Sequence, residues 1–235
     1  MVRIAALLIS LTFAATGRAE HGKLIFEDDF ERTESQEKKD EPGNGWKTNS
    51  SRRAKGDKQV DLKDGAMHIF ISPKADHGVS VTHEAEFKDG AVAMRFMLED
   101  EKDSLGLNFA DLQCKEVWAG HLFVVKVFPT QVVFQDLKTG MMDLEIRNAK
   151  KGAGLSKEQK KMLEEKQKKL PLSLETGNWH ELLVQVQGRE LQLSVNGKDV
   201  GGFASEGIEH PTKRMLRLAV PRHAVVDEVK IWSRE

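Results

Sequence analysis

The feature that most constrains this chain is a run of alternating apolar and polar residues between Asn178 and Phe203. Apolar side chains recur at nearly every second position, at Trp179, Leu182, Val184 and Val186 and then at Leu191, Leu193 and Val195. A period of two is that of a half-buried β-strand. Gly188 separates the two runs, and Asn196-Gly197 supplies the positive φ of a tight turn. The stretch therefore predicts antiparallel strands joined by turns.

Strands of the same kind are predicted along most of the chain, at residues 23–30, 59–62, 66–72, 79–87, 91–98, 104–110, 121–134, 214–220 and 224–232. No parallel-crossover helices lie between them. The sequence therefore predicts an all-β fold, a two-sheet antiparallel jelly-roll sandwich. In the strand at 79–87, His83 shares the apolar face. In the strand at 91–98, Arg95 lies on the face opposite Val92, Met94 and Phe96.

The strand pattern is interrupted twice. Residues 31–58 are polar and lose their period, so we expect a long surface excursion with Trp46 as its anchor. Residues 155–170 predict one surface helix, with Ser156 as its N-cap and Gln159 completing a capping box. The helix is rich in lysine, which we interpret as a solvated face. The alternative is a patch that attracts anionic polysaccharide.

The N-terminus has the features of a secretory signal peptide. Arg3 precedes an apolar run from Ile4 to Ala15 that is too short to span a bilayer, and Gly17-Arg18-Ala19 forms a small-residue ending. We expect residues 1–19 to be a cleaved signal peptide and residues 20–235 to form a single domain, secreted or periplasmic. A retained membrane anchor is the alternative. No second stretch is apolar enough for a membrane span.

Composition narrows the range of partners. The chain carries 36 basic and 37 acidic side chains, and loss of Arg3 and Arg18 gives a mature net charge of about −3, which argues against a nucleic-acid partner. Cys114 is the single cysteine, so the core must hold the fold without an internal disulfide. Tyrosine is absent, which leaves mainly the tryptophans to stack on a sugar. We expect Trp179 and Trp232 in the core and Trp118, in a loop, as a sugar-stacking platform.

Short motifs near both ends resemble a known fold family. VDEVKIW at 226–232, WHE at 179–181, the Asn196-Gly197 turn and FEDDF at 26–30 are similar to laminin-G-like, concanavalin A-like jelly rolls. They are also similar to bacterial secreted domains of the 3-keto-disaccharide hydrolase type. The resemblance implies a two-sheet fold over nearly the whole mature chain. The superfamily includes lectins, glycosidases, lyases and adhesion modules, so the fold does not select an activity.

The same resemblance implies a structural calcium ion where the first and last strands meet. Asp227 with Glu27 or Asp28 would supply its oxygen ligands. Surface charge is the alternative explanation for these carboxylates. The sequence defines no other cofactor.

A carboxylate pair would favour glycoside hydrolysis. Laminarinase-type enzymes place their acids on one strand face as Glu-x-Asp-x-Glu, and no such run occurs in this chain. Glu84 and Glu86 have the spacing of two, which we interpret as a solvated strand face. The sequence therefore leaves open whether the protein only binds a glycan or also cleaves it.

Functional side-chain types gather around residues 108–121. Asp111 and His121 lie here, and His83 could join them in a catalytic His and carboxylate site. A structured loop with ordinary polar contacts is the alternative. The predicted contacts to substrate are polar and aromatic, from Arg95, Asn108, Trp118 and Lys126.

The sequence as a whole predicts a secreted jelly roll that binds, and in one reading processes, an extracellular glycan or oligosaccharide. Two alternatives remain open at this stage. One is a glycoside hydrolase or lyase that acts on 3-keto-glycosides or other glycans. The other is an adhesion or assembly module without a sugar ligand.

Overall fold

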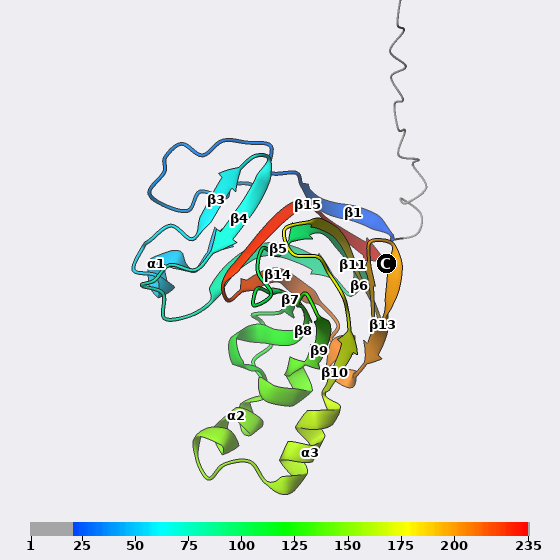
Figure 1. Ribbon diagram of the computed structural model, residues 1–235. Coiled ribbons are helices and arrows are strands. Elements are labelled where there is room, and N and C mark those ends of the chain that lie inside the picture. Colours follow the sequence, from blue (N-terminus) through cyan, green and yellow to red (C-terminus); the bar gives the residue numbers. More distant parts are fainter. Residues whose placement is uncertain (1–20, 235) are drawn as a thin grey trace, which may run out of the picture.

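A computed structural model describes residues 21–234 of the chain, and the predicted signal peptide at 1–19 lies outside them. The described residues form two antiparallel sheets packed face to face, which confirms the predicted sandwich (Figure 1). Sheet A contains, in spatial order, β13 (Lys198–Ala204), β12 (Glu190–Val195), β11 (Trp179–Gln187), β6 (Asp89–Met97), β15 (His223–Arg234), β4 (Ala66–Phe70) and β3 (Val60–Lys63). Sheet B contains β10 (Gln167–Pro171), β9 (Gln131–Asp136), β8 (His121–Val127), β7 (Leu105–Ala110), β14 (Lys213–Val220), β5 (Val79–Phe87) and β2 (Lys47–Thr48).

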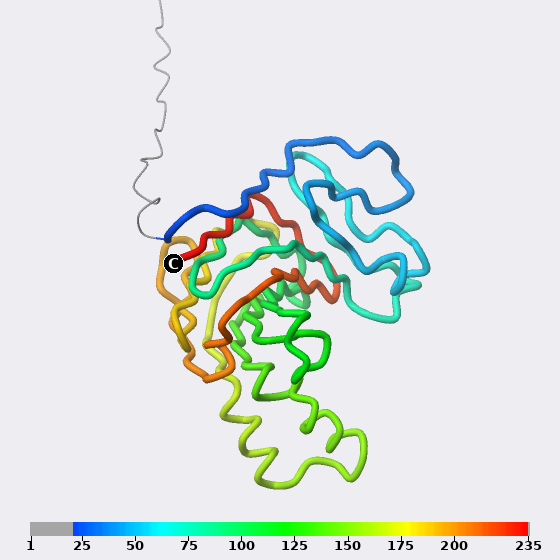
Figure 2. The backbone as a smooth tube through the Cα atoms, turned by 180° about the vertical axis from the view of Figure 1, so that it is seen from behind, coloured from blue at the N-terminus to red at the C-terminus, as the bar shows by residue number. Residues whose placement is uncertain are grey.

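The two ends of the described chain meet in sheet A. β1 (Lys23–Asp28) pairs antiparallel with the second half of β15, and Figure 2 shows the first segment running beside the last. β15 is long enough to pair with β4 and β6 as well. This closure joins the ends of the domain without a disulfide. No helix within residues 21–234 is both long and apolar enough to cross a membrane.

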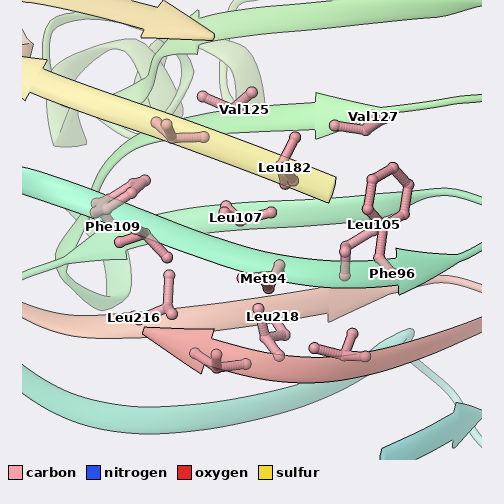
Figure 3. Packing of buried hydrophobic residues seen from close by; sticks show 14 of the residues in the cluster. Met94, Phe96, Leu105, Leu107, Phe109, Val125, Val127, Leu182, Leu216 and Leu218 are labelled. Atoms are coloured by element: carbon pink, nitrogen blue, oxygen red, sulfur yellow. The ribbon is translucent and has the colours of Figure 1, made fainter. Parts of the chain in front are cut away.

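The core lies between the sheets and consists of the apolar side chains that alternate along the strands, as the sequence predicted. Leu105, Leu107 and Phe109 of β7 face inward, as do Met94 and Phe96 of β6 (Figure 3). Burial of each such side chain stabilises the fold by about 1.5–3 kcal/mol. The Phe109 ring also stacks on Phe123 of β8, with ring centroids 4.6 Å apart. These contacts fix the register of the central strands of sheet B.

Two tryptophans do not lie where the sequence suggested. Trp179 is 38% exposed, and Trp232 is only partly buried. In β11 the inward residues are Leu182, Val184 and Val186, so Trp179 falls on the opposite face of the strand. Trp232 likewise follows the buried Ile231. Both indoles therefore lie on the outer face of sheet A rather than in the core, because the alternation is offset by one residue from the expected register.

The predicted helical insertion is larger and more broken than one helix. α3 (Lys157–Glu165) begins at the Ser156 cap with the expected capping box, but the chain then returns to β structure in β10. Before it come a π-helical turn η3 (Leu137–Met141) and α2 (Leu144–Lys151), which were not predicted. Figure 1 shows α2 and α3 projecting beyond the edge of sheet B. The remaining short elements are α1 (Ser50–Arg53), η2 (Trp118–Gly120) and η4 (Glu206–Glu209).

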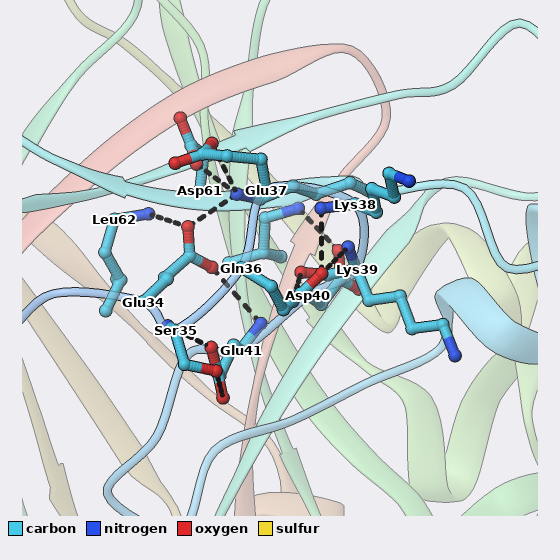
Figure 4. A network of polar contacts seen from close by, with 12 residues as sticks. Glu34, Ser35, Gln36, Glu37, Lys38, Lys39, Asp40, Glu41, Asp61 and Leu62 are labelled. Carbon is cyan, nitrogen blue, oxygen red and sulfur yellow. Dashed lines mark hydrogen bonds and ion pairs between the residues drawn. The ribbon is translucent and has the colours of Figure 1, made fainter.

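The polar excursion at 31–58 is ordered by ion pairs rather than by apolar packing. The Lys58 ammonium lies 2.5 Å from Glu34 and also binds Asp61 (Figure 4). Asp40 accepts hydrogen bonds from the backbone N–H groups of Gln59, at 2.7 Å, and Val60, at 2.9 Å. Trp46 is buried, as expected of an anchor. The excursion thus packs against β3 through its carboxylates.

Asp136 at the end of β9 joins the insertion to the sandwich. Its buried carboxylate accepts hydrogen bonds from the backbone N–H and hydroxyl of Thr139, from the Ser205 hydroxyl at 2.6 Å and from the Gly207 N–H at 2.9 Å. Gly207 leaves the space that this carboxylate occupies, since a Cβ there would lie 2.0 Å from Asp136 Oδ1. One carboxylate therefore holds two loops from distant parts of the chain.

We predict that Asp136→Ala lowers the free energy of unfolding by about 3–5 kcal/mol, because it leaves several buried donors without an acceptor. Chemical denaturation measures this change. Asp143→Ala is the matched control. It removes only the N-cap bond to Ile146 at 3.0 Å and should cost about 1 kcal/mol. Equal losses in the two variants would show that Asp136 is no more than a local cap.

Candidate functional site

The outer face of sheet B carries a row of polar side chains across its central strands. Arg217 of β14 pairs with Thr82 of β5 and with Asn108 of β7, Asn108 pairs with Val124 of β8, and Val124 pairs with Gln135 of β9. Paired residues in antiparallel strands project to the same side. These side chains therefore share the face that points away from the core.

A second row beside it contains Lys126 and small residues. Lys126 pairs with Gly106 of β7, which in turn pairs with Ala219 of β14. A Cβ at Gly106 would lie 3.7 Å from Lys126 Cγ, so the lysine stem lies close to the bare backbone. The whole of β7 is buried, and Asn108 is only 4% exposed. Neighbouring side chains therefore cover β7 on the outer face as well as on the inner one.

Asn108, His121 and Arg217 are in direct contact. Asn108 Oδ1 lies 3.0 Å from His121 Nδ1, and Arg217 Nη1 lies 2.9 Å from both ring nitrogens of His121. On the neighbouring strands Lys126 Nζ donates to Gln135 Oε1 at 2.8 Å. The site thus offers an amide, an imidazole, a guanidinium and an ammonium group on one rigid sheet.

The charges of this site are unbalanced. Burial and the positive charges of Arg217 and Arg147 lower the pKa of His121 to about 4, so its ring is neutral at pH 7. Burial also lowers the pKa values of Lys126 and Arg217. Within residues 21–234 neither cation forms an ion pair with a carboxylate. The site is consequently cationic and poorly hydrated.

Trp118 borders the site. It begins the η2 turn that leads into β8, and it is 50% exposed. Two cations of α2 lie over its ring, Arg147 with Cζ 4.6 Å from the centroid and Lys151 with Nζ 5.4 Å from it. The turn also reaches Arg217, whose Nη2 lies 3.5 Å from the Ala119 carbonyl. Trp118 is therefore an accessible ring at the edge of the polar rows.

Gly120 makes this turn possible. It has a φ of +70°, and a Cβ there would lie 2.5 Å from the Asp111 carbonyl oxygen. Only glycine fits such a close approach. The Asp111 N–H donates back to the Gly120 carbonyl at 2.8 Å, which closes the loop that carries Trp118.

The Asp111 carboxylate is buried, and each of its two oxygens has a hydrogen-bond partner. Its carboxylate accepts hydrogen bonds from Arg214 Nη1 at 2.7 Å, from the Gln113 N–H at 2.8 Å and, at 3.0 Å, contacts His210 Nε2. Burial alone would raise the pKa of Asp111, but the His210 and Gln113 contacts and the Arg214 charge together hold it below its usual value. The structure thus uses Asp111 to anchor the loop, and leaves no free carboxylate of this residue for chemistry.

Two predicted site residues lie elsewhere. His83 points to the inner side of β5, where its ring stacks on Phe26 with centroids 3.6 Å apart and its Nε2 lies 3.2 Å from the Asn44 carbonyl. Arg95 projects from the outer face of sheet A, where it pairs with Asp227 at 3.2 Å and lies over Trp179. Both therefore lie apart from Asn108 and His121, because successive strand residues alternate between faces and the two sheets have opposite outer faces.

The carboxylates expected to bind calcium do not form a cluster. Both oxygens of Asp28 bind Arg32, and one also accepts from the Trp46 indole at 2.8 Å. Asp227 pairs with Arg95, and Glu27 projects from β1 on the side opposite Asp28. Over residues 21–234, no group of three or more histidine, cysteine or acidic side chains could hold a metal ion. These residues do not fit a calcium site.

A hollow of about 510 Å³ lies on the outer face of sheet A. Its walls include Leu24, Glu27, Arg95, Glu181 and Trp232. Carboxylates accompany the cations here, since Arg95 also lies 3.6 Å from Glu228. This hollow therefore differs from the outer face of sheet B in having balanced charge.

Sequence reasoning found Asn108, His121, Trp118 and Lys126, which the structure brings to one region, but missed Arg217 and Gln135. Arg217 lies between Leu216 and Leu218 in a predicted strand, so its outward direction could have been read from the alternation. Its place beside Asn108 could not, because these residues are 109 positions apart and only the strand order joins them.

We predict that the His121 ring does not titrate between pH 8 and pH 5, with a midpoint near 4 in an NMR titration of its ring protons. The unfolded chain would take up a proton near pH 6.5, so the site costs stability as pH falls from about 6.5 to 4. His121→Gln should therefore lose less stability than the wild type over that interval. A His121 midpoint near 6.5 would contradict the buried, cationic surroundings.

No protein-family model and no curated protein sequence matches the chain. Solved structures do. A carbohydrate-binding module from Bacillus subtilis, CBM66, superposes with a TM-score of 0.54 at 12% identity over 80% of this chain and 96% of that one. A laminarinase from Rhodothermus marinus gives 0.57 at 11% identity over 91% and 98%. A β-glucanase from Bacillus licheniformis gives 0.55 at 12% identity over 91% and 99%. At such identity the likeness concerns the fold, and the chain has the concanavalin A-like jelly-roll sandwich predicted from its sequence.

Proposed function

We propose that the protein binds a carbohydrate on the outer face of sheet B. One observation carries this proposal: Asn108, His121, Gln135 and Arg217 share the outer face of sheet B, with Trp118 at its border. Sugars combine hydroxyl groups that need fixed donors and acceptors with apolar ring faces that pack on aromatic side chains. The four polar groups supply the former and the exposed indole supplies the latter.

The similar structures support the proposal from a second direction. One is described as a carbohydrate-binding module, and others are described as laminarinase and β-glucanase. Fold likeness alone does not transfer a ligand. It becomes informative here because the chain also carries polar groups and an exposed ring on a sheet face.

We favour binding over hydrolysis because the two candidate carboxyl groups, those of Asp111 and Glu84, are already paired. A retaining mechanism needs two carboxyls about 5–5.5 Å apart, and an inverting one needs them about 6.5–9.5 Å apart. Asp111 is already bonded to its neighbours, and Glu84, on the outer face of β5, is 72% exposed and pairs with Lys47 at 2.7 Å. Each of these two carboxylates therefore already has a cationic partner. Cleavage of 3-keto-glycosides, or elimination, remains the second candidate, favoured by the neutral imidazole of His121.

The compartment belongs to the same proposal. The signal-peptide pattern at residues 1–19 supports export, and an extracellular or periplasmic protein would meet glycans directly. Fractionation of cells that express the full chain tests this. Mature protein that begins at Glu20 outside the cytoplasm is the expected result, and uncleaved protein inside the cell would contradict it.

We predict that Trp118→Ala weakens glycan binding by about tenfold, since loss of an aromatic contact with its buried area costs about 1–2 kcal/mol. Titration calorimetry with glycans selected on an array measures the change. Trp179→Ala is a matched control, because Trp179 is also exposed and also lies under an arginine, with Arg95 Cζ 4.8 Å from its ring. The control lies on sheet A and should bind as the wild type does.

Equal losses in the two variants would place the binding face elsewhere, and an array without any bound glycan would contradict the proposed function. Mass spectrometry of the bound glycans after incubation separates binding from cleavage. Products that His121→Ala abolishes would make the second candidate correct. Unchanged glycans are the expected result.

A further inference from the structure

We propose, building on the glycan-binding function above, that the outer face of sheet B recognises an acidic sugar chain, whose carboxylate or sulfate groups bind Arg217 and Lys126. The starting point is a contrast among the cations of this chain. Arg32 pairs with Asp28, Lys58 with Glu34, and Lys166 with Glu206. Arg217 and Lys126 are half-buried, but they have no carboxylate partner within residues 21–234.

Such an arrangement is costly in a folded protein. Withdrawing a charge from water costs several kcal/mol unless an opposite charge or hydrogen bonds offset it. The partners present are neutral: His121 and the Ala119 carbonyl for Arg217, and Gln135 for Lys126. An anionic ligand would supply the missing counter-charge. The two cations therefore have the surroundings of a ligand-binding site rather than those of a structural ion pair.

Lys213 provides a useful comparison. It is buried and has no ion pair, but its Nζ donates to the Lys88 carbonyl at 2.6 Å and lies over the Phe123 ring, at 5.9 Å. Its ammonium is thus held by a backbone oxygen against the core. Arg217 and Lys126 instead project from the outer face, where a ligand can reach them.

The donor geometry suits a planar or tetrahedral anion. Arg217 uses Nη1 against the His121 ring, while Nη2 makes only long contacts, 3.5 Å to the Ala119 carbonyl and 3.9 Å to Met215 Sδ. A guanidinium can turn two parallel N–H groups toward a carboxylate. Beside Lys126, the neighbours in its row are Gly106 and the small Ala219, so no long side chain of that row stands next to the lysine on β7 or β14.

The rim of the site extends the positive charge. Arg147 and Lys151 lie over Trp118, and the Nε of Arg147 is buried without a hydrogen-bond acceptor. Neither residue forms an ion pair in the described part of the chain. A sugar that stacks on Trp118 would therefore have cations on both sides, from α2 and from sheet B. The cations beside Trp118 thus come from α2, whereas the lysine-rich helix predicted at 155–170 corresponds to α3.

The experiment compares matched pairs of oligosaccharides that differ only in charge. Oligogalacturonides and their carboxyl-reduced neutral counterparts form one pair, and sulfated galactan oligosaccharides and their desulfated counterparts form another. Titration calorimetry at low and at 0.5 M salt gives the affinities. We expect one acidic member to bind about 10- to 100-fold more tightly than its neutral counterpart, with an advantage that shrinks in salt. The pair that shows the advantage identifies carboxylate or sulfate.

Variants then locate the anion. Arg217→Gln and Lys126→Met should each lower the affinity for the acidic member by a larger factor than the affinity for the neutral one, so that the advantage of the acidic member shrinks. Lys169→Gln is the matched control, because Lys169 is an exposed cation that pairs with Val133 at the edge of the same sheet. A loss as large in Lys169→Gln as in Arg217→Gln would mean diffuse attraction and would overturn the assignment of the site.

A stability measurement separates a ligand-binding role from a structural one. Without ligand, Arg217→Gln and Lys126→Met should unfold at the same temperature as the wild type or higher, because each removes a buried charge that lacks a counter-ion. A large loss of stability would overturn the proposal in favour of a structural role. Neutral sugars that bind as tightly as acidic ones would overturn the anion preference and leave glycan binding intact. Failure of every member to bind would overturn both.

Discussion

The site depends on the register of β7 against β8 and β14. Phe109 and Phe123 stack in the core, and this contact fixes which residues of the two strands lie opposite each other. Because Asn108 adjoins Phe109 in β7, its side chain faces outward, beside that of Arg217. A slip of one residue would turn Asn108 into the core and Phe109 onto the polar face. Core packing on one side of sheet B is therefore what holds the polar row in place on the other.

This dependence explains what the sequence could and could not predict. Alternation alone placed Asn108 and Lys126 on strands and assigned Arg95 and His83 to faces that the structure confirms. It could not say that sheet A carries Arg95 and sheet B carries Asn108, because strand order is set by contacts between distant segments. The grouping of Arg95 with Asn108 failed for this reason, whereas that of His83 with His121 failed because His83 faces the inner side of sheet B.

Loops were less predictable than strands, and Asp111 shows why. Its position after β7 suggested a free carboxylate near His121. Its partners His210 and Arg214 come from the far end of the sequence, about a hundred residues away. Nothing local in the sequence indicates that they reach it. The offset of Trp179 has a simpler cause, since the four buried residues that follow it in β11 occur at even positions whereas Trp179 is at an odd one.

Trp118 and Trp179 have nearly the same local chemistry but opposite electrostatic settings. Each is an exposed indole under an arginine, at 4.6 Å from Arg147 and 4.8 Å from Arg95. Arg95 is neutralised by Asp227, so its stack on Trp179 is a closed arrangement on the surface of sheet A. Arg147 has no carboxylate partner in the described residues, and Arg217 and Lys126 nearby have none either. The charge pattern, more than the aromatic ring, therefore distinguishes the face for which we propose a ligand from the face of balanced charge.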